Sequence, residues 1–318
     1  RSFDDVQPQN VELELVAAPG LPEFPDCNGE PRNVRFILET KEYEAEIAPG
    51  ITYPFMSFNG GVPGPAIVVS LGDWVEVMLR NPAESKHAHN VDFHAATGAL
   101  GGGAVSIVGP GAQTTIRFQT VKEGVFLYHC AVAPHVTSGR YVAIVVLPKD
   151  GLPGVDKQFC LMEGDFYTEP PLDDPAKHVY PTARTANENP SYVVTNGKVG
   201  VLTGDNALTV NVGEKVRFYY GQADLYSWPH IIGGHLDVVY GRGSFHPDSD
   251  REYGVETTVV PASSVIAFEY MFKYPGVYLL VNHELIKATE KEQAVQISVE
   301  GETNTDIMTV VSPPSQIN

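Results

Sequence analysis

Cysteine, basic residues and long apolar runs are all scarce in this sequence. Only three of the 318 residues are cysteine, which excludes a fold held together by a disulfide framework and leaves open one bridge between Cys27 and Cys160. Lysine and arginine number 21 against 39 aspartates and glutamates, so the formal net charge is −18. A nucleic-acid-binding protein needs a basic face, so this balance argues against nucleic acid as a partner. No run approaches the ~18 consecutive apolar residues of a transmembrane helix.

Glycine and proline are plentiful, with 30 and 25 residues, and they separate short apolar segments. Residues 73–80 and 115–119 alternate apolar and polar side chains as half-buried strands do, and residues 141–147 form a β-branched run typical of a buried strand. Helical periodicity is confined to a short segment around residues 285–293. Short strands at regular spacing predict an all-β sandwich.

The two halves of the sequence repeat each other. The matching segments are 72–77 and 213–218, then His89-x4-His94 and His230-x4-His235, then 124–128 and 276–280. The first two matches share an offset of 141 residues, and the third has an offset of 152. Matches in the same order predict two tandem copies of one sandwich, joined near residues 148–153. We therefore expect domains at residues 1–150 and 151–318.

The first copy places histidines around a cysteine. Two imidazoles with one thiolate favour copper used for electron transfer, whereas structural zinc sites prefer paired cysteines, which are absent here. His89 upstream, followed by Cys130-x4-His135, has this form. Asn90 could hydrogen-bond the thiolate and tune the copper. The sequence therefore predicts a copper centre in the first copy.

Strand geometry sorts the remaining histidines. Neighbouring residues of a strand point to opposite faces, so His129 would point away from a metal that Cys130 binds. His89 and His94 are five residues apart and would also serve different sites. The two predicted groups are His89, Cys130 and His135, and His94 with His129. His283 ends the equivalent strand of the second copy and is the natural third histidine of the second group, across a domain or subunit interface. Three histidines with an open position are typical of a catalytic metal.

Longer motifs show a family resemblance. They are residues 58–65, 89–103, 128–131, 229–235, 281–283 and 306–309, in family order over nearly the whole chain. The sequence closely resembles the copper-containing dissimilatory nitrite reductases, which are homotrimers of two-domain cupredoxin subunits. The resemblance implies an all-β fold of two tandem cupredoxin-like Greek-key β-sandwich domains. It also implies two coppers per subunit, type 1 for electron transfer and type 2 for catalysis.

The resemblance also implies roles for individual residues. The type 1 positions are His89, Cys130 and His135, and the type 2 positions are His94 and His129 with His283 supplied by the neighbouring subunit. Asp92 and His230 match the acid/base pair that flanks bound nitrite, and Ile232 matches the apolar residue that caps the substrate pocket. The implied reaction takes one electron and two protons and releases nitric oxide and water, as in denitrification.

The type 1 loop departs from the family pattern. In the family the loop is longer and ends in Ser/Asn-Gly-Met, whose methionine is the weak axial ligand. Here four residues separate Cys130 from His135, and Arg140 follows Ser138-Gly139. A guanidinium cannot coordinate copper, so the axial position would be empty or filled by a backbone oxygen, water or another side chain, with Met56 as the candidate methionine. Loss of a thioether donor raises the copper potential, and the short loop leaves the type 1 geometry and occupancy open.

Two other functions stay open at this point. A two-domain multicopper oxidase needs several His-x-His pairs and a His-Cys-His cluster, but only His87-Ala88-His89 has the spacing and Ala131 replaces the third member. The other is a non-enzymatic copper protein, either an electron carrier or a copper-binding trimer.

Partners and location follow from the resemblance. It implies nitrite and a small electron donor, cytochrome c or cupredoxin, as partners. It also implies a periplasmic or cell-surface location, with the leader absent from the opening residues RSFDDVQPQN. The acidic surplus would suit a basic donor.

The remaining histidines and cysteines have plainer interpretations. His87, His178 and His246 are expected to be ordinary polar residues, and His235 is either structural or channel-lining. Cys160 lies in a strand-like segment and is expected to be an inert buried thiol.

Overall fold

Strands dominate the computed structural model, which describes residues 9–26, 29–132, 134–181 and 185–316. Strand accounts for 45% of the chain and helix for 7%, so the predicted all-β class is confirmed. The predicted strand at residues 141–147 is β9 (Tyr141–Leu147), which is buried along its whole length. The predicted strand at 73–80 is β5 (Trp74–Asn81), and the one at 115–119 lies within β7 (Ala112–Gln119).

The strands of the first half form two sheets. The first contains β1 (Gln9–Glu12), β2 (Arg32–Ala48), β5 and β7 in that order, with β3 (Ile51–Phe58) paired to β2. The second contains β4 (Ile67–Ser70), β9, β8 (Gly124–His129) and β6 (Asp92–Phe93) in that order. β6 is therefore the edge strand of the second sheet.

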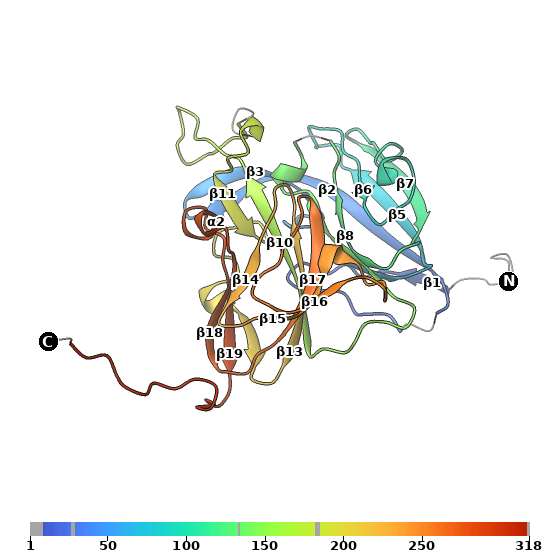
Figure 1. The fold of residues 1–318 in the computed structure, drawn as a ribbon. Coiled ribbons are helices and arrows are strands. Elements are labelled where there is room, and N and C mark those ends of the chain that lie inside the picture. Colours follow the sequence, from blue (N-terminus) through green and yellow to red (C-terminus); the bar gives the residue numbers. More distant parts are fainter. Residues whose placement is uncertain (1–8, 27–28, 133, 182–184, 317–318) are drawn as a thin grey trace.

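The strands of the second half form two more sheets. The larger one has the order β11 (Tyr192–Thr195), β10 (Lys157–Phe166), β13 (Lys215–Gln222), β17 (Ser264–Met271), β15 (Leu236–Tyr240) and β16 (Arg251–Val255). The smaller one has the order β12 (Leu208–Asn211), β19 (Val295–Glu300), β18 (Gly276–Asn282) and β14 (Pro229–Ile232). Figure 1 shows the two halves side by side, with the first in blue to green and the second in yellow to red.

The internal repeat predicted from sequence is present in the sheet topology. β4 pairs with β9 in parallel, and β9, β8 and β6 follow as antiparallel neighbours. In the second half β12 pairs with β19 in parallel, and β19, β18 and β14 follow as antiparallel neighbours. The segments 124–128 and 276–280 open β8 and β18, which occupy the same place in their sheets. β6 and β14 are therefore the edge strands of these two sheets. β6 lies beside β8, and β14 lies beside β18.

Helices are few and short. The predicted helical segment at 285–293 contains α2 (Leu285–Thr289), which is shorter than expected: the helix ends at Glu290, its C-cap. Glu292, further along the segment, has a φ of 69° and lies outside helical geometry. The 3-10 turns are η2 (Ala99–Gly102), η3 (Val136–Ser138), η4 (Gly204–Asn206) and η5 (Gly241–Gly243). In the described part of the chain no helix is long and apolar enough to span a bilayer.

The interior consists of two apolar clusters. One is centred on the strands of the first half and the other on those of the second half. Cys160 is a free, fully buried thiol in the first cluster, and burial raises its pKa to about 12, as expected for an inert cysteine. Its proposed bridging partner, Cys27, lies outside the described residues. After β19 the chain leaves the body as an exposed tail, residues 301–316 (Figure 1).

Candidate metal centres

His89, Cys130 and His135 come together in the interior of the first half. Their donor atoms lie within 4.8 Å of one another, and all three residues are buried. The Nδ1 atoms of His89 and His135 are 3.1 Å apart, and Cys130 Sγ is 3.4 Å from His135 Nδ1. Two imidazole nitrogens and one sulfur converging in this way match the donor set that binds copper in electron-transfer sites. The residues present therefore fit a copper ion.

Backbone pairing holds the three donors in place. His89 and Val108 exchange two backbone hydrogen bonds of 2.9 and 2.8 Å. Cys130 follows the last residue of β8, and its N–H donates to the Arg140 carbonyl at 3.2 Å. The Arg140 N–H in turn donates to the His135 carbonyl at 3.2 Å. Arg140, directly before β9, thus holds the backbone of both Cys130 and His135 through hydrogen bonds.

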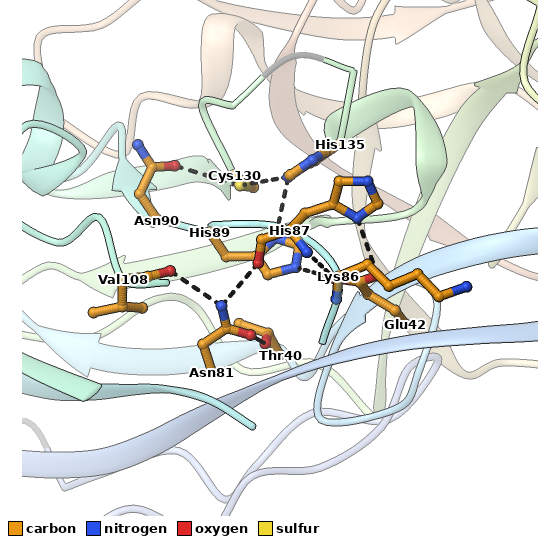
Figure 2. Close-up of polar contacts among 10 residues, drawn as sticks. All are labelled: Thr40, Glu42, Asn81, Lys86, His87, His89, Asn90, Val108, Cys130 and His135. Carbon is orange, nitrogen blue, oxygen red and sulfur yellow. Dashed lines mark hydrogen bonds and ion pairs between the residues drawn. The ribbon is translucent and has the colours of Figure 1, made fainter. Parts of the chain in front are cut away.

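The second nitrogen of His89 contacts a carboxylate that sequence reasoning missed. His89 Nε2 lies 3.0 Å from Glu42 Oε1, and His87 Nδ1 lies 3.0 Å from Glu42 Oε2. Glu42 also accepts the backbone N–H groups of Lys86 and His87. Figure 2 shows His89 between Glu42 on one side and Cys130 with His135 on the other. A carboxylate on the far nitrogen orients a ligating imidazole and raises its basicity.

Charge and burial set the protonation of this cluster. Burial, and after it the nearby Arg140 guanidinium, lowers the pKa of His89 to about 3 and that of His135 to about 4. Although burial raises the pKa of Glu42, the hydrogen bonds from His89 and His87 outweigh it, so that pKa lies below its ordinary value. Both imidazoles are therefore neutral at pH 7, which is the form that binds a metal.

Asn90 contacts the sulfur, but with the opposite polarity to that predicted. Its Oδ1 accepts from the Cys130 thiol at 3.4 Å and from the Ala131 N–H at 2.8 Å. Its Nδ2, the donor of this side chain, donates instead to the Gly103 carbonyl at 3.0 Å. The Ala131 N–H needs an acceptor, and this need turns the amide oxygen toward the cluster.

Arg140 occupies the sequence position where the resembling family has its axial methionine. This residue is fully buried, and its guanidinium lies 4.2 Å from the centre of the Phe58 ring. Met56 of β3 instead lines a cavity of about 590 Å³ with His87 and His135 at the surface of the short loop. An axial role for Met56 stays a prediction.

A second group of donors lies at the β6 edge of the sheet that contains β8. The donor atoms of Asp92, His94 and His129 lie within 4.8 Å of one another. The Nε2 atoms of the two histidines are 3.1 Å apart, and Asp92 Oδ2 is 3.7 Å from His129 Nε2. Asp92 of β6 pairs with His129 of β8, and the His94 N–H donates to the Leu127 carbonyl. Burial, followed by repulsion from His129, lowers the pKa of His94.

The Asp92 carboxylate depends on a glycine whose role sequence reasoning missed. Gly101 has a φ of 57°, and a Cβ added there would overlap Asp92 Oδ1 and the Phe93 carbonyl. Only glycine combines this left-handed backbone with the space that the carboxylate fills. The glycine run at residues 101–103 was the available signal, although its sequence shows only that it is not a phosphate loop. Gly101 therefore holds open the place of Asp92.

His283 does not join His94 and His129 within one copy of the chain. It lies beside His230, with ring centroids 4.7 Å apart. His230 is in β14, and His283 follows the last residue of β18, the strand that pairs with β14. The His283 N–H donates to the Trp228 carbonyl, and His230 Nδ1 is 2.8 Å from the Glu256 carbonyl. Ile232 at the end of β14 is 47% exposed. The described residues thus form two separate groups at the edges of two sheets. One group is Asp92, His94 and His129 at the β6 edge, and the other is His230, His283 and Ile232 at the β14 edge.

The remaining histidines are less informative. His235 is exposed, and His178 shares a 2.8 Å hydrogen bond with Thr168. His87, expected to be an ordinary polar residue, contacts Glu42, the same carboxylate that contacts His89 of the first cluster. His246 is at the surface beside Asp248.

Known proteins were compared with this chain in sequence and in structure. A family profile described as multicopper oxidase matches residues 44–150. The copper-containing nitrite reductase of Alcaligenes faecalis is 43% identical over 330 residues, 96% of this chain and 86% of that protein. That of Alcaligenes xylosoxydans xylosoxydans is 42% identical over 96% of this chain and 98% of that protein. The solved structure of a copper nitrite reductase from Nitrosomonas europaea superposes with a TM-score of 0.73 at 27% identity, covering 86% of this chain and 96% of that one.

Proposed function

Because the chain belongs to the copper-containing nitrite reductases, we propose which of its residues carry out copper-dependent nitrite reduction. His89, Cys130 and His135 hold the type 1 copper, and His94 and His129 hold the type 2 copper with His283 of a neighbouring copy. The observation that carries this proposal is the pair of donor groups reached by the adjacent residues His129 and Cys130. The comparisons do not favour the oxidase or the non-enzymatic carrier.

The two coppers supply a one-electron relay and a Lewis acid for nitrite, and the chain supplies the connections between them. His129 and Cys130 share a peptide bond, so the electron path between the two centres is covalent. Asp92, kept in place by Gly101 and 3.7 Å from His129 Nε2, hydrogen-bonds a nitrite oxygen and delivers the first proton. Reduction by one electron with two protons yields nitric oxide and water.

His230 delivers the second proton. Its Nδ1 donates to the Glu256 carbonyl at 2.8 Å, which leaves Nε2 as the atom that takes up and releases the proton. Ile232 covers the nitrite pocket with an apolar side chain. Asp92 is in β6 and His230 is in β14, the edge strands of two different sheets. Both residues therefore reach one nitrite only when the β6 edge of one copy meets the β14 edge of another.

A homotrimer brings these edges together. Each copy exposes Trp228 and Ile232 beside His283, at 39% and 47%. The tail after β19 is also exposed at Ile307, Met308, Val310 and Val311, at 51%, 61%, 76% and 93%. Apolar side chains gathered in this way favour a protein interface. We place domain 1 at residues 1–150 and domain 2 at 151–318, since each of the four sheets draws its strands from one half. A periplasmic location and a small cytochrome c or cupredoxin as electron donor complete the proposal.

Mixed oligomers test the shared site. His94→Ala and His283→Ala should each lose type 2 copper and nitrite turnover while the type 1 copper remains. Coexpression of the two variants should restore part of the turnover, because some interfaces then join an intact His94 edge to an intact His283 edge. His235→Ala, an exposed histidine of the second half, is the matched control and should keep both coppers. A mixture that stays inactive, or His283→Ala that retains type 2 copper, would refute the shared site.

A further inference from the structure

A guanidinium without a hydrogen-bond partner lies beside the His89, Cys130 and His135 cluster. Arg140 has 0% of its surface exposed, and within the described part of the chain none of its Nε, Nη1 and Nη2 atoms has a hydrogen-bond partner. The guanidinium lies over the face of the Phe58 ring, 4.2 Å from its centroid. Burial of an unpaired charge is costly, so such a group in a folded protein has to be explained by its surroundings.

The position of this charge is fixed relative to the donors. The Arg140 N–H donates to the His135 carbonyl, and its carbonyl accepts from the Cys130 N–H, each at 3.2 Å. Burial lowers the pKa of Arg140 to about 10, so the side chain is a cation at neutral pH. The negative groups that act on it most strongly are Cys130 and Glu42. Glu42 is itself hydrogen-bonded to the far nitrogen of His89 at 3.0 Å.

These two charges act on bound copper in opposite directions. Reduction of Cu(II) to Cu(I) takes up one electron from the donor and removes one positive charge from the site. A cation held in the low-dielectric interior repels Cu(II) more than Cu(I). A carboxylate on the back of His89 attracts Cu(II) more than Cu(I) and strengthens the imidazole as a ligand.

We propose that Arg140 and Glu42 are opposing fixed charges that set the reduction potential of the copper held by His89, Cys130 and His135. Arg140 favours the reduced copper and Glu42 the oxidised copper. This proposal rests on the type 1 assignment made above. The guanidinium thus replaces the tuning role of an axial ligand with a charge that does not bind the metal. The resulting potential sets the driving force for each electron passed on through Cys130 and His129.

The test measures the midpoint potential of copper-loaded protein from its visible thiolate-to-Cu(II) absorption, which reports this centre alone. Arg140→Leu removes the charge without adding a donor, and we expect at least a tenfold shift of the Cu(II)/Cu(I) affinity ratio toward Cu(II). For a one-electron couple that is a fall of about 59 mV or more. Arg140→Met should fall at least as far, because a thioether adds a donor that stabilises Cu(II). Glu42→Gln should raise the potential.

Controls separate this proposal from the site assignment. Arg80→Leu removes an exposed arginine from β5 and should leave the potential unchanged. An absorption band that persists in Cys130→Ser overturns the type 1 assignment, and so does a native protein without a band at any applied potential. A band that disappears in Cys130→Ser but keeps its midpoint in Arg140→Leu overturns the role of Arg140 alone. A lower midpoint in Glu42→Gln overturns the role of Glu42.

Discussion

Asp165 should make the protein less stable as the pH rises toward 8. This residue of β10 is 1% exposed, its Oδ2 accepts from the Leu225 N–H at 3.0 Å, and its Oδ1 has no partner in the described part of the chain. Burial, followed by repulsion from Glu163, raises its pKa from 3.8 to about 7. Between these values the folded protein holds a proton that the unfolded chain has lost. Stability contributed by that proton is full below the unfolded pKa and is lost as the pH rises through the folded one.

The magnitude follows from that pKa difference. At about 1.36 kcal/mol per pH unit, the rise to about 7 corresponds to at most about 4 kcal/mol of stability lost by pH 8. Asp165→Asn keeps an oxygen for the Leu225 N–H and carries no charge at any pH. Its free energy of unfolding should match that of the native protein near pH 4 and exceed it by up to about 4 kcal/mol at pH 8.

Urea denaturation from pH 4 to 8.5, at one protein concentration and one copper loading, measures this difference. Asp150→Asn is the control, because Asp150 is exposed and its replacement should change nothing at any pH. A difference between Asp165→Asn and the native protein that is the same at pH 5 and pH 8 would refute the argument. An Asp165→Asn protein that is the less stable of the two at pH 8 would refute it as well.

Three further predictions concern the site and its donor. Asp92→Asn should keep both coppers yet lose about 10²–10⁴-fold in turnover, the usual contribution of a general acid, and an unchanged rate would remove Asp92 from the mechanism. Gly101→Ala should displace the Asp92 carboxylate and lower nitrite turnover while copper content stays unchanged. Gly154→Ala is the control and should keep full turnover, because a Cβ there meets open space. Equal turnover in the two variants would contradict the role of Gly101. With a basic donor protein, the electron-transfer rate should fall steeply with added salt because the chain carries a net charge of −18, and stopped-flow rates that ignore salt would count against electrostatic docking.

Much of the fold could be predicted from local patterns. Alternation of apolar and polar residues located β5 and β7, and the apolar run located β9, because side-chain period and burial are local properties of a strand. The shared offset of the histidine pairs indicated a duplicated sandwich, and the matching sheet orders agree with it. The length of the helix near Leu285 could not be predicted: α2 ends at Thr289, although the periodic pattern continues to residue 293.

The sequence by itself determined that two adjacent residues, His129 and Cys130, belong to two different groups of donors. His129 ends β8 and Cys130 follows it directly, so these two neighbours face different groups of donors. The tertiary structure decided which distant groups meet them. Glu42 reaches His89 from a strand 47 residues away, Gly101 makes room for Asp92, and the Asn90 amide turns its oxygen to the sulfur. Arg140 was visible in the sequence as a side chain that cannot bind copper. Only the closed interior around Phe58 makes it an unpaired charge, within the described residues, beside the predicted copper ligands, because burial depends on the packing of the whole chain.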